Sequence, residues 1–89
     1  MIEEPSAKSE IQNYADTMRK RIWLRIGWLI ETRKLTYRGV AARAGVDHFT
    51  ILTNVKSARA GKVPADTKLD TLAGICKALD QPLSFFMQV

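Results

Sequence analysis

The sequence predicts an all-α protein in which five helices follow a loose N-terminal tail. Apolar residues recur at spacings of three and four along several segments, which is the period of a helix with one buried face. Capping residues, glycines and prolines separate these segments, and no stretch has the alternating pattern of a convincing strand. With 89 residues, of which 46% are hydrophobic, the chain has the size and composition of one globular domain.

The tail and the first helix differ in their hydrophobic pattern. Residues 1–16 are polar and acidic, include Pro5 and show no stable period, so we expect them to form the tail. Residues 17–89 are expected to form the folded domain, whose first helix runs from about Thr17 to about Lys34. The apolar face of this helix comprises Met18, Ile22, Ile26, Leu29 and Ile30, with Trp23 at its margin.

Two short helices joined by a glycine turn are expected next. Thr36 can accept backbone N–H groups as the N-cap of a helix over residues 37–44. Gly45 can take the left-handed conformation that ends this helix, and Asp47 can cap a third helix over residues 48 to about 57. The expected inner faces are Val40, Ala41 and Ala44 on the first of the two, and Ile51, Leu52 and Val55 on the second.

A loop over residues 58–64 precedes the expected fourth helix. Asp66 or Thr67 can cap this helix, which ends near Leu79. Its apolar positions are Leu69, Leu72, Ile75, Cys76 and Leu79. The single cysteine, Cys76, therefore falls within an apolar helical pattern and is expected to be a buried structural thiol.

The C-terminal residues predict a fifth, short helix over residues 83–87, which Pro82 permits at its start. This helix carries several apolar side chains, and we expect it to be too short to bury all of them within one chain. The sequence therefore predicts a homodimer whose interface contains Leu83, Phe85, Phe86 and Met87.

The net charge of +5 is concentrated in the middle of the chain. Residues 17–62 hold eleven Lys or Arg against Glu31 and Asp47, a net charge of +9. Residues 1–16 hold one Lys against four acids, a net charge of −3, and residues 63–89 hold two Lys against three acids, a net charge of −1. This distribution indicates a polyanionic partner, although a solvated basic face on an ordinary helical protein would have the same composition.

The composition disfavours several classes of function. With one His and one Cys, the sequence offers no metal-binding cluster, no Cys/His pair and no cofactor site, and it has no glycine-rich phosphate loop. We therefore do not expect an enzyme. The chain contains no run of about 18 apolar residues and no signal-peptide pattern, so we expect a cytoplasmic protein that does not enter a membrane.

The residues from Leu35 to Ile51 resemble the Cro/C1-type (XRE-like) helix-turn-helix pattern of bacterial and phage regulators. The most specific part is the Val40-Ala41 pair followed by Gly45-Val46, and Thr71–Leu79 followed by Leu83–Phe86 resembles the family's fourth and fifth helices. The resemblance implies a five-helix, lambda-repressor-like domain. It also implies a homodimer that binds operators of two-fold symmetry.

The same resemblance implies which residues contact DNA. The outward positions of the family's recognition helix match His48, Phe49, Thr50, Thr53 and Lys56, and Tyr37 falls where the family often has a Gln that holds a phosphate. The cations that flank this surface are candidate phosphate contacts, or are merely solvated: Arg38, Arg43, Lys56, Arg59 and Lys62. Phe49 could pack on a thymine methyl, in the core or in an interface.

Two functions follow from these residues. The first is a sequence-specific transcriptional regulator, either a repressor or an activator, that binds double-stranded DNA. The alternative is a protein-binding module of the same fold, which acts on a partner regulatory protein as an antiactivator or antitoxin. The apolar character of the recognition helix, and the placement of Asn54 where the family usually buries an aliphatic residue, keep this alternative open.

Leu24 and Trp28 do not fit the core face of the first helix. At 100° per residue they point away from Ile22 and Ile26. Either the N-terminal segment folds back over them with Ile11 and Tyr14, or they form an exposed apolar patch for another protein.

Overall fold

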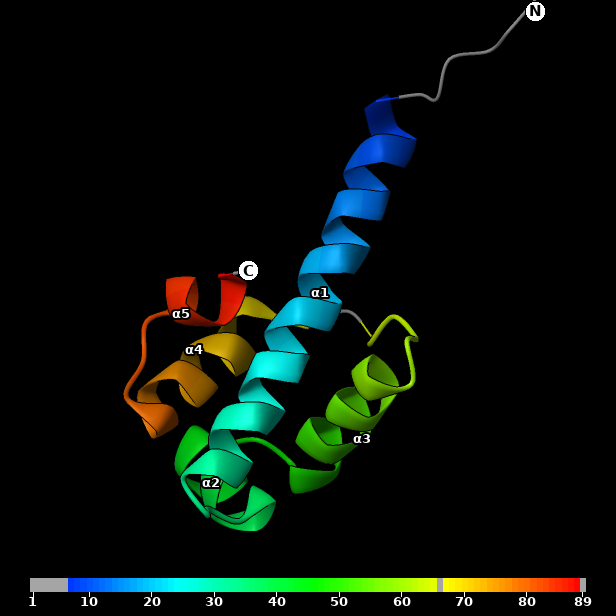
Figure 1. The fold of residues 1–89 in the computed structure, drawn as a ribbon. Helices are drawn as coiled ribbons and strands as arrows, with labels where there is room; N and C mark the ends of the chain where they lie inside the picture. Colours follow the sequence, from blue (N-terminus) through cyan, green and yellow to red (C-terminus); the bar gives the residue numbers. More distant parts are fainter. Residues whose placement is uncertain (1–6, 66, 89) are drawn as a thin grey trace, which may run out of the picture.

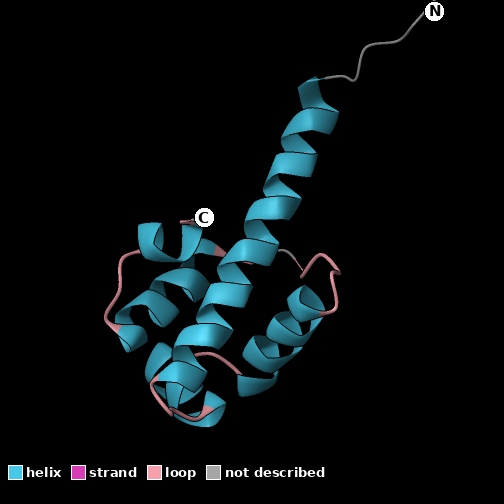
Figure 2. Cartoon of the chain, viewed as in Figure 1, coloured by secondary structure: helices cyan, strands magenta, loops and turns pink. Residues whose placement is uncertain are grey.

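The computed structural model describes residues 7–65 and 67–88, and the elements in these residues are five helices (Figures 1 and 2). The predicted all-α, five-helix architecture is confirmed. The helices are α1 (Ala7–Thr32), α2 (Tyr37–Ala44), α3 (His48–Arg59), α4 (Leu69–Leu79) and α5 (Leu83–Met87). Within the described residues, no helix is long and apolar enough to cross a membrane.

Helix α1 begins at Ala7 rather than near Thr17, so most of the segment expected as a tail is helical. This part of α1 extends beyond the other helices (Figure 1), and residues 8–14 are exposed. The Asp16 carboxylate accepts a hydrogen bond from Gln12, one turn before it, and another from Arg19, one turn after it, each at 2.9 Å. Hydrophobic periodicity did not predict this segment because it detects only helices with a buried face. Residues 1–6 of the expected tail lie outside the described residues.

The core forms around the second half of α1, which packs between α3 and α5 (Figure 1). From α1 it receives Ile22, Trp23, Ile26, Leu29 and Ile30. The other helices contribute Val40 and Ala41 from α2, Ile51, Val55 and Ala58 from α3, Ile75 and Leu79 from α4, and Phe86 from α5. The expected apolar faces are therefore largely the faces that the fold buries.

Trp23 is central to the core and not at its margin. Its side chain is 1% exposed, and its indole Nε1–H donates a hydrogen bond to Thr67 Oγ1 at 3.0 Å. A buried tryptophan needs a partner for this N–H, and the loop before α4 supplies it. Thr67 is thus used by Trp23 and does not cap α4, whose N-cap position is Lys68 without a side-chain cap. Asp66, the other expected cap, lies outside the described residues.

The caps predicted for α2 and α3 are confirmed. Thr36 Oγ1 accepts from the backbone N–H of Gly39, and Asp47 Oδ1 accepts from that of Phe49, both at 3.0 Å. Gly45 has φ +71°, the left-handed conformation that glycine adopts without a steric cost. A three-residue turn therefore joins two capped helices. Helix α3 continues to Arg59, two residues into the expected loop.

Two glycines allow close helix crossings. A Cβ on Gly27 of α1 would lie 2.6 Å from Val55 Cγ1 of α3. A Cβ on Gly74 of α4 would lie 2.3 Å from the carbonyl oxygen of Ala44 at the end of α2. The second contact is against backbone, which cannot rotate away as a side chain can, so α2 and α4 can approach this closely only with glycine at position 74.

Replacing Gly74 with Ala should therefore destabilise the fold, by about 1–3 kcal/mol in urea denaturation, because the added methyl group forces α2 and α4 apart. In a helix without this contact the same change stabilises by up to about 1 kcal/mol, so the sign of the effect is diagnostic. The control is Ala73→Ser, an enlargement of the neighbouring exposed residue, which should cost about 0.5 kcal/mol or less. A Gly74→Ala variant more stable than the parent would contradict the close crossing.

Candidate nucleic-acid interface

Helix α3 has one buried face and one outward face. Ile51, Asn54, Val55 and Ala58 are buried against the body of the domain. Phe49, Thr53 and Lys56 are exposed, and at 100° per residue they lie within about 60° of one another around the helix. Thr50 is also exposed, farther round the helix. The structure thus brings three of the five expected base-contacting residues of α3 onto one strip, whereas Thr50 and His48 lie about 100° from Phe49 on opposite sides of it.

His48 and Phe49 form a pair at the start of this strip. Their ring centroids are 4.2 Å apart, and His48 Nδ1 lies 3.7 Å from Asp47 Oδ1, which is longer than a hydrogen bond. His48 is half-buried, whereas Phe49 is 60% exposed. Core packing, one of the roles considered for Phe49, is therefore excluded, and contact with a thymine methyl or with a partner protein is left.

An open hollow of about 410 Å³ lies where α2 meets the turn and the start of α3. It is lined by Arg38, Ala41, Ala42, Val46, Asp47 and His48. The hollow places the guanidinium-bearing side chain of Arg38 on the same surface as the imidazole of His48. These two expected contacts, which are ten positions apart in sequence, therefore belong to one site.

Four of the expected phosphate contacts are exposed: Arg38 and Arg43 on α2, Lys56 on α3 and Lys62 in the loop after α3. Within the described residues, the structure records no ion pair between these side chains and a carboxylate. A phosphate that approached this surface would thus meet cations that need not first leave an acidic partner.

Arg59 and Tyr37 are in a different state, because both contact Glu31 near the end of α1. The guanidinium of Arg59 makes a two-pronged ion pair with the carboxylate, with Nη1 3.0 Å from Oε1 and Nη2 against Oε2. The Tyr37 hydroxyl donates to Oε1 at 3.4 Å. These two residues were expected to contact phosphates, and a phosphate would have to compete with Glu31 for them.

The ion pair shifts the pKa of each group in this cluster. The hydrogen bond from Arg59 lowers the pKa of the Glu31 carboxyl, and the same bond raises the pKa of Arg59. Burial, followed by the nearby Glu31 charge, raises the pKa of the Tyr37 hydroxyl. Sequence reasoning missed Glu31, although it is one of only two acids among residues 17–62 and so was a candidate to neutralise one of the expected contacts.

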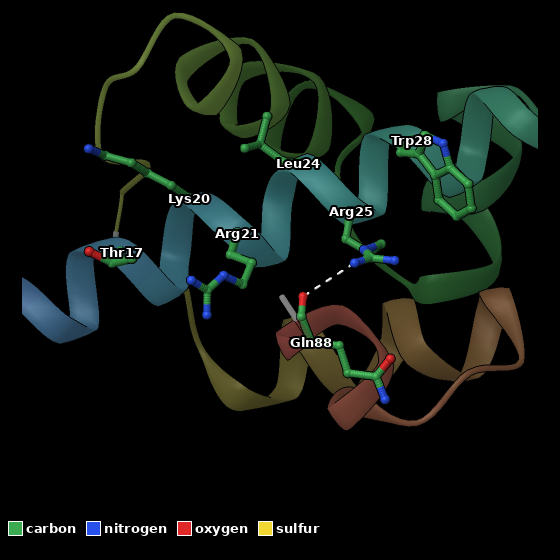
Figure 3. Close-up of a pocket in the computed structure, with 7 residues that line it drawn as sticks. All are labelled: Thr17, Lys20, Arg21, Leu24, Arg25, Trp28 and Gln88. Carbon is green, nitrogen blue, oxygen red and sulfur yellow. Dashed lines mark hydrogen bonds between the residues drawn. The ribbon is translucent and has the colours of Figure 1, made fainter.

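Leu24 and Trp28 are exposed, at 41% and 50%. The expectation that Ile11 and Tyr14 fold back over them is wrong, because those residues lie farther along the same continuous helix and are themselves 67% and 68% exposed. Leu24 and Trp28 instead line a groove on α1 (Figure 3). Of the two arrangements considered for them, the exposed apolar patch is the one that the structure contains.

Of the four residues expected in a dimer interface, three join or contact the core of their own chain: Phe85, Phe86 and Met87. Phe86 is fully buried in the core, and Leu83, Phe85 and Met87 are half-buried. The ring of Phe85 meets that of Phe86 edge to face, with centroids 5.3 Å apart, and Arg25 of α1 lies over Phe85 at 5.4 Å. The short helix buries Phe86 in the core and leaves its other three apolar side chains half-buried, so the reason for placing Phe86 in an interface no longer holds.

Other chemistry is sparse among residues 7–65 and 67–88. No three His, Cys, Asp or Glu side chains in these ranges lie close enough to hold a metal ion. Cys76 is half-buried, and this burial raises the pKa of its thiol. No family model matches the chain, and none of the curated proteins or solved structures compared with it matches either.

The Glu31–Arg59 pair predicts a pH-dependent contribution to stability. Because the folded state lowers the pKa of Glu31 below its ordinary value of 4.5, the contribution is present above that value and is lost as the pH falls through the folded pKa. The melting temperature of the parent chain should exceed that of Glu31→Gln near neutral pH, and the difference should vanish in acid.

Arg59→Gln is the matched control for this comparison. Once the guanidinium is gone, the further change Glu31→Gln should have a much smaller pH-dependent effect on the melting temperature, because only the long hydrogen bond from Tyr37 still favours the charged carboxylate. A difference that persisted in the Arg59→Gln background would assign the pH dependence to another group.

Proposed function

We propose that this chain is a sequence-specific, DNA-binding transcriptional regulator that inserts α3 into the major groove of double-stranded DNA. The observation that carries the proposal is the outward strip of α3, which bears Phe49 and Thr53, together with four exposed cations that have no recorded carboxylate partner among the described residues. The two helices and the short turn that joins them support it, since this unit is suited to present its second helix to a groove.

The proposed contacts divide by chemistry. Thr50 and Thr53 would touch base edges or a thymine methyl, and His48 would donate to a guanine or a phosphate. The flanking cations would hold phosphates and so fix the position of α3 without reading sequence. They are Arg38, Arg43, Lys56 and Lys62.

The resemblance to Cro/C1-type regulators extends the proposal to a homodimer on an operator of two-fold symmetry. Such a dimer presents two copies of α3, which read two half-sites about one helical turn apart or a multiple of that distance. An enzyme is not part of the proposal.

Selection from a duplex library with a random central sequence tests the proposal, because a sequence-specific regulator should enrich one motif. Affinity for the selected duplex should fall steeply with salt. If a dimer uses the four flanking cations on each chain, it neutralises about eight phosphates, and the log–log slope should be about −7. Absence of enrichment, together with an affinity insensitive to salt, would contradict DNA binding.

Two substitutions on the α3 strip should have different effects on this binding. Thr53→Ala should relax the preference at particular positions, at a cost of about 1–3 kcal/mol for the affected bases. Lys56→Ala should weaken all duplexes about equally and reduce the salt slope by about 2 in a dimer, because each chain loses one phosphate contact. Lys77→Ala, an exposed lysine on α4, is the control and should change neither quantity.

A protein-binding module of the same fold, acting as an antiactivator or antitoxin, is the second candidate. The exposure of Phe49 favours it, since a large apolar ring at 60% exposure on a helix face is suited to a protein interface. The duplex selection with the parent chain separates the two functions, because a protein module should select no motif. If the parent selects a motif, Phe49→Ala should alter it, since the ring would then contact DNA.

A further inference from the structure

A groove lies along α1, where it is bordered by the end of α5 (Figure 3). Its volume is about 570 Å³. Seven residues line it: Thr17, Lys20, Arg21, Leu24, Arg25, Trp28 and Gln88. The groove does not include any residue of the α3 strip, so it is a separate surface from the proposed DNA interface.

The groove combines an apolar floor with basic side chains. Leu24 and Trp28 supply the apolar area, and Lys20 and Arg21 supply positive charge. Arg25 is held in place by the groove itself: its guanidinium lies 5.7 Å from the Trp28 ring centre and donates to the backbone oxygen of Gln88 at 3.3 Å. Such a surface fits a segment that is both apolar and acidic.

The projecting first half of α1 is a segment of this kind. It exposes the apolar side chains of Ile11 and Tyr14 and the acidic side chain of Glu10, whereas Asp16 is already engaged by Gln12 and Arg19. Residues 7–16, the part of this segment that lies in α1, hold one Lys against two acids, a net charge of −1, opposite in sign to the groove. One helix therefore carries an apolar surface with one exposed acid, Glu10, near its start and a basic apolar surface near its end.

These two surfaces cannot meet within one chain. Tyr14 and Trp28 lie on the same continuous helix, in which fourteen residues span about 20 Å at 1.5 Å per residue. A helical extension that packs against nothing is also marginal in water, because isolated short helices gain little from propensity alone. A second copy of the chain would supply the packing that the extension lacks.

We propose that two copies of this chain pair through antiparallel α1 helices, so that the projecting half of each α1 lies in the groove of the other. Tyr14, Thr17, Arg21, Leu24 and Trp28 follow spacings of three, four, three and four, which is the repeat of a two-helix seam. A two-fold axis near residue 19 places Tyr14 of one copy opposite Leu24 of the other. The antiparallel arrangement also aligns the helix dipoles favourably.

This pairing assigns the homodimer interface to α1 and not to α5, where the sequence predicted it. It does not rest on the proposed DNA binding, because it follows from the surfaces of α1 alone. Its test contains no nucleic acid, so its failure and the failure of the proposed function are distinguishable.

Sedimentation of the full chain across a micromolar concentration range tests the pairing. The parent chain should dimerise. The groove variant carries Leu24→Ser and Trp28→Ala. The tip variant carries Ile11→Ser and Tyr14→Ser in the projecting first half of α1, which is called the tip here. Each variant should self-associate at least about tenfold more weakly than the parent, because central apolar contacts are lost. Leu69→Ser, which removes an exposed apolar side chain from α4, should leave the dimer intact.

Mixing the two variants gives the sharper result. In a dimer of either variant with itself, both tip–groove contacts contain an altered surface. In a mixed dimer, the unaltered tip of the groove variant can lie in the unaltered groove of the tip variant, so one contact is intact. The mixture should therefore form heterodimers more tightly than either variant forms homodimers. The altered residues are all exposed, and thermal melting by circular dichroism checks that the variants fold.

Three outcomes would overturn the pairing. The first is a parent chain that stays monomeric throughout, even if it captures another protein through the groove. The second is a groove or tip variant that dimerises as tightly as the parent. The third is a mixture of folded variants that forms no heterodimer, since this would mean that tip and groove do not contact each other.

Discussion

The position of α3 depends on the buried face of α1. Ile22, Trp23, Ile26 and Ile30 form a continuous apolar surface, and α3 and α5 pack against it on different sides. Gly27 lies within this part of α1 and lets Val55 of α3 come closer than any side chain at that position would allow. Because α3 is anchored on one face in this way, its opposite face, which carries Phe49 and Thr53, is turned outward.

Glu31 organises the charge around the end of α1. It pairs with Arg59 and accepts from Tyr37, so one of the five expected phosphate-binding cations is engaged within the chain, and the other four have no recorded carboxylate partner among the described residues. Because the pair is exposed to water, its contribution to stability is modest, and its larger effect is on which cations are available to a partner. The net charge of a segment therefore overstates the charge that a ligand would meet.

The two halves of α1 have different surroundings. This difference connects the proposed self-association with the proposed DNA binding. Its second half is the centre of the core, and its first half extends into solvent with exposed apolar side chains. The surface proposed for self-association lies on the outer face of α1, and the surface proposed for DNA lies on the outer face of α3. Distinct residues serve each, so each can be altered by substitution without removing the other.

Local physical chemistry was enough to predict much of this protein. Capping by Thr36 and Asp47, the left-handed Gly45 and the 3.6-residue period depend on neighbours within a few positions, so the sequence alone determined the middle helices, their turn and most of the core. The early start of α1 escaped prediction because an exposed helix has no buried face to produce a period.

Contacts between residues distant in sequence were decided only by the tertiary structure. These are the burial of Trp23 with Thr67 as its partner, the capture of Arg59 by Glu31, the enclosure of Phe86 and the groove beside Trp28. Each requires knowing which helix faces lie against one another, and spacing along a single helix does not contain that information.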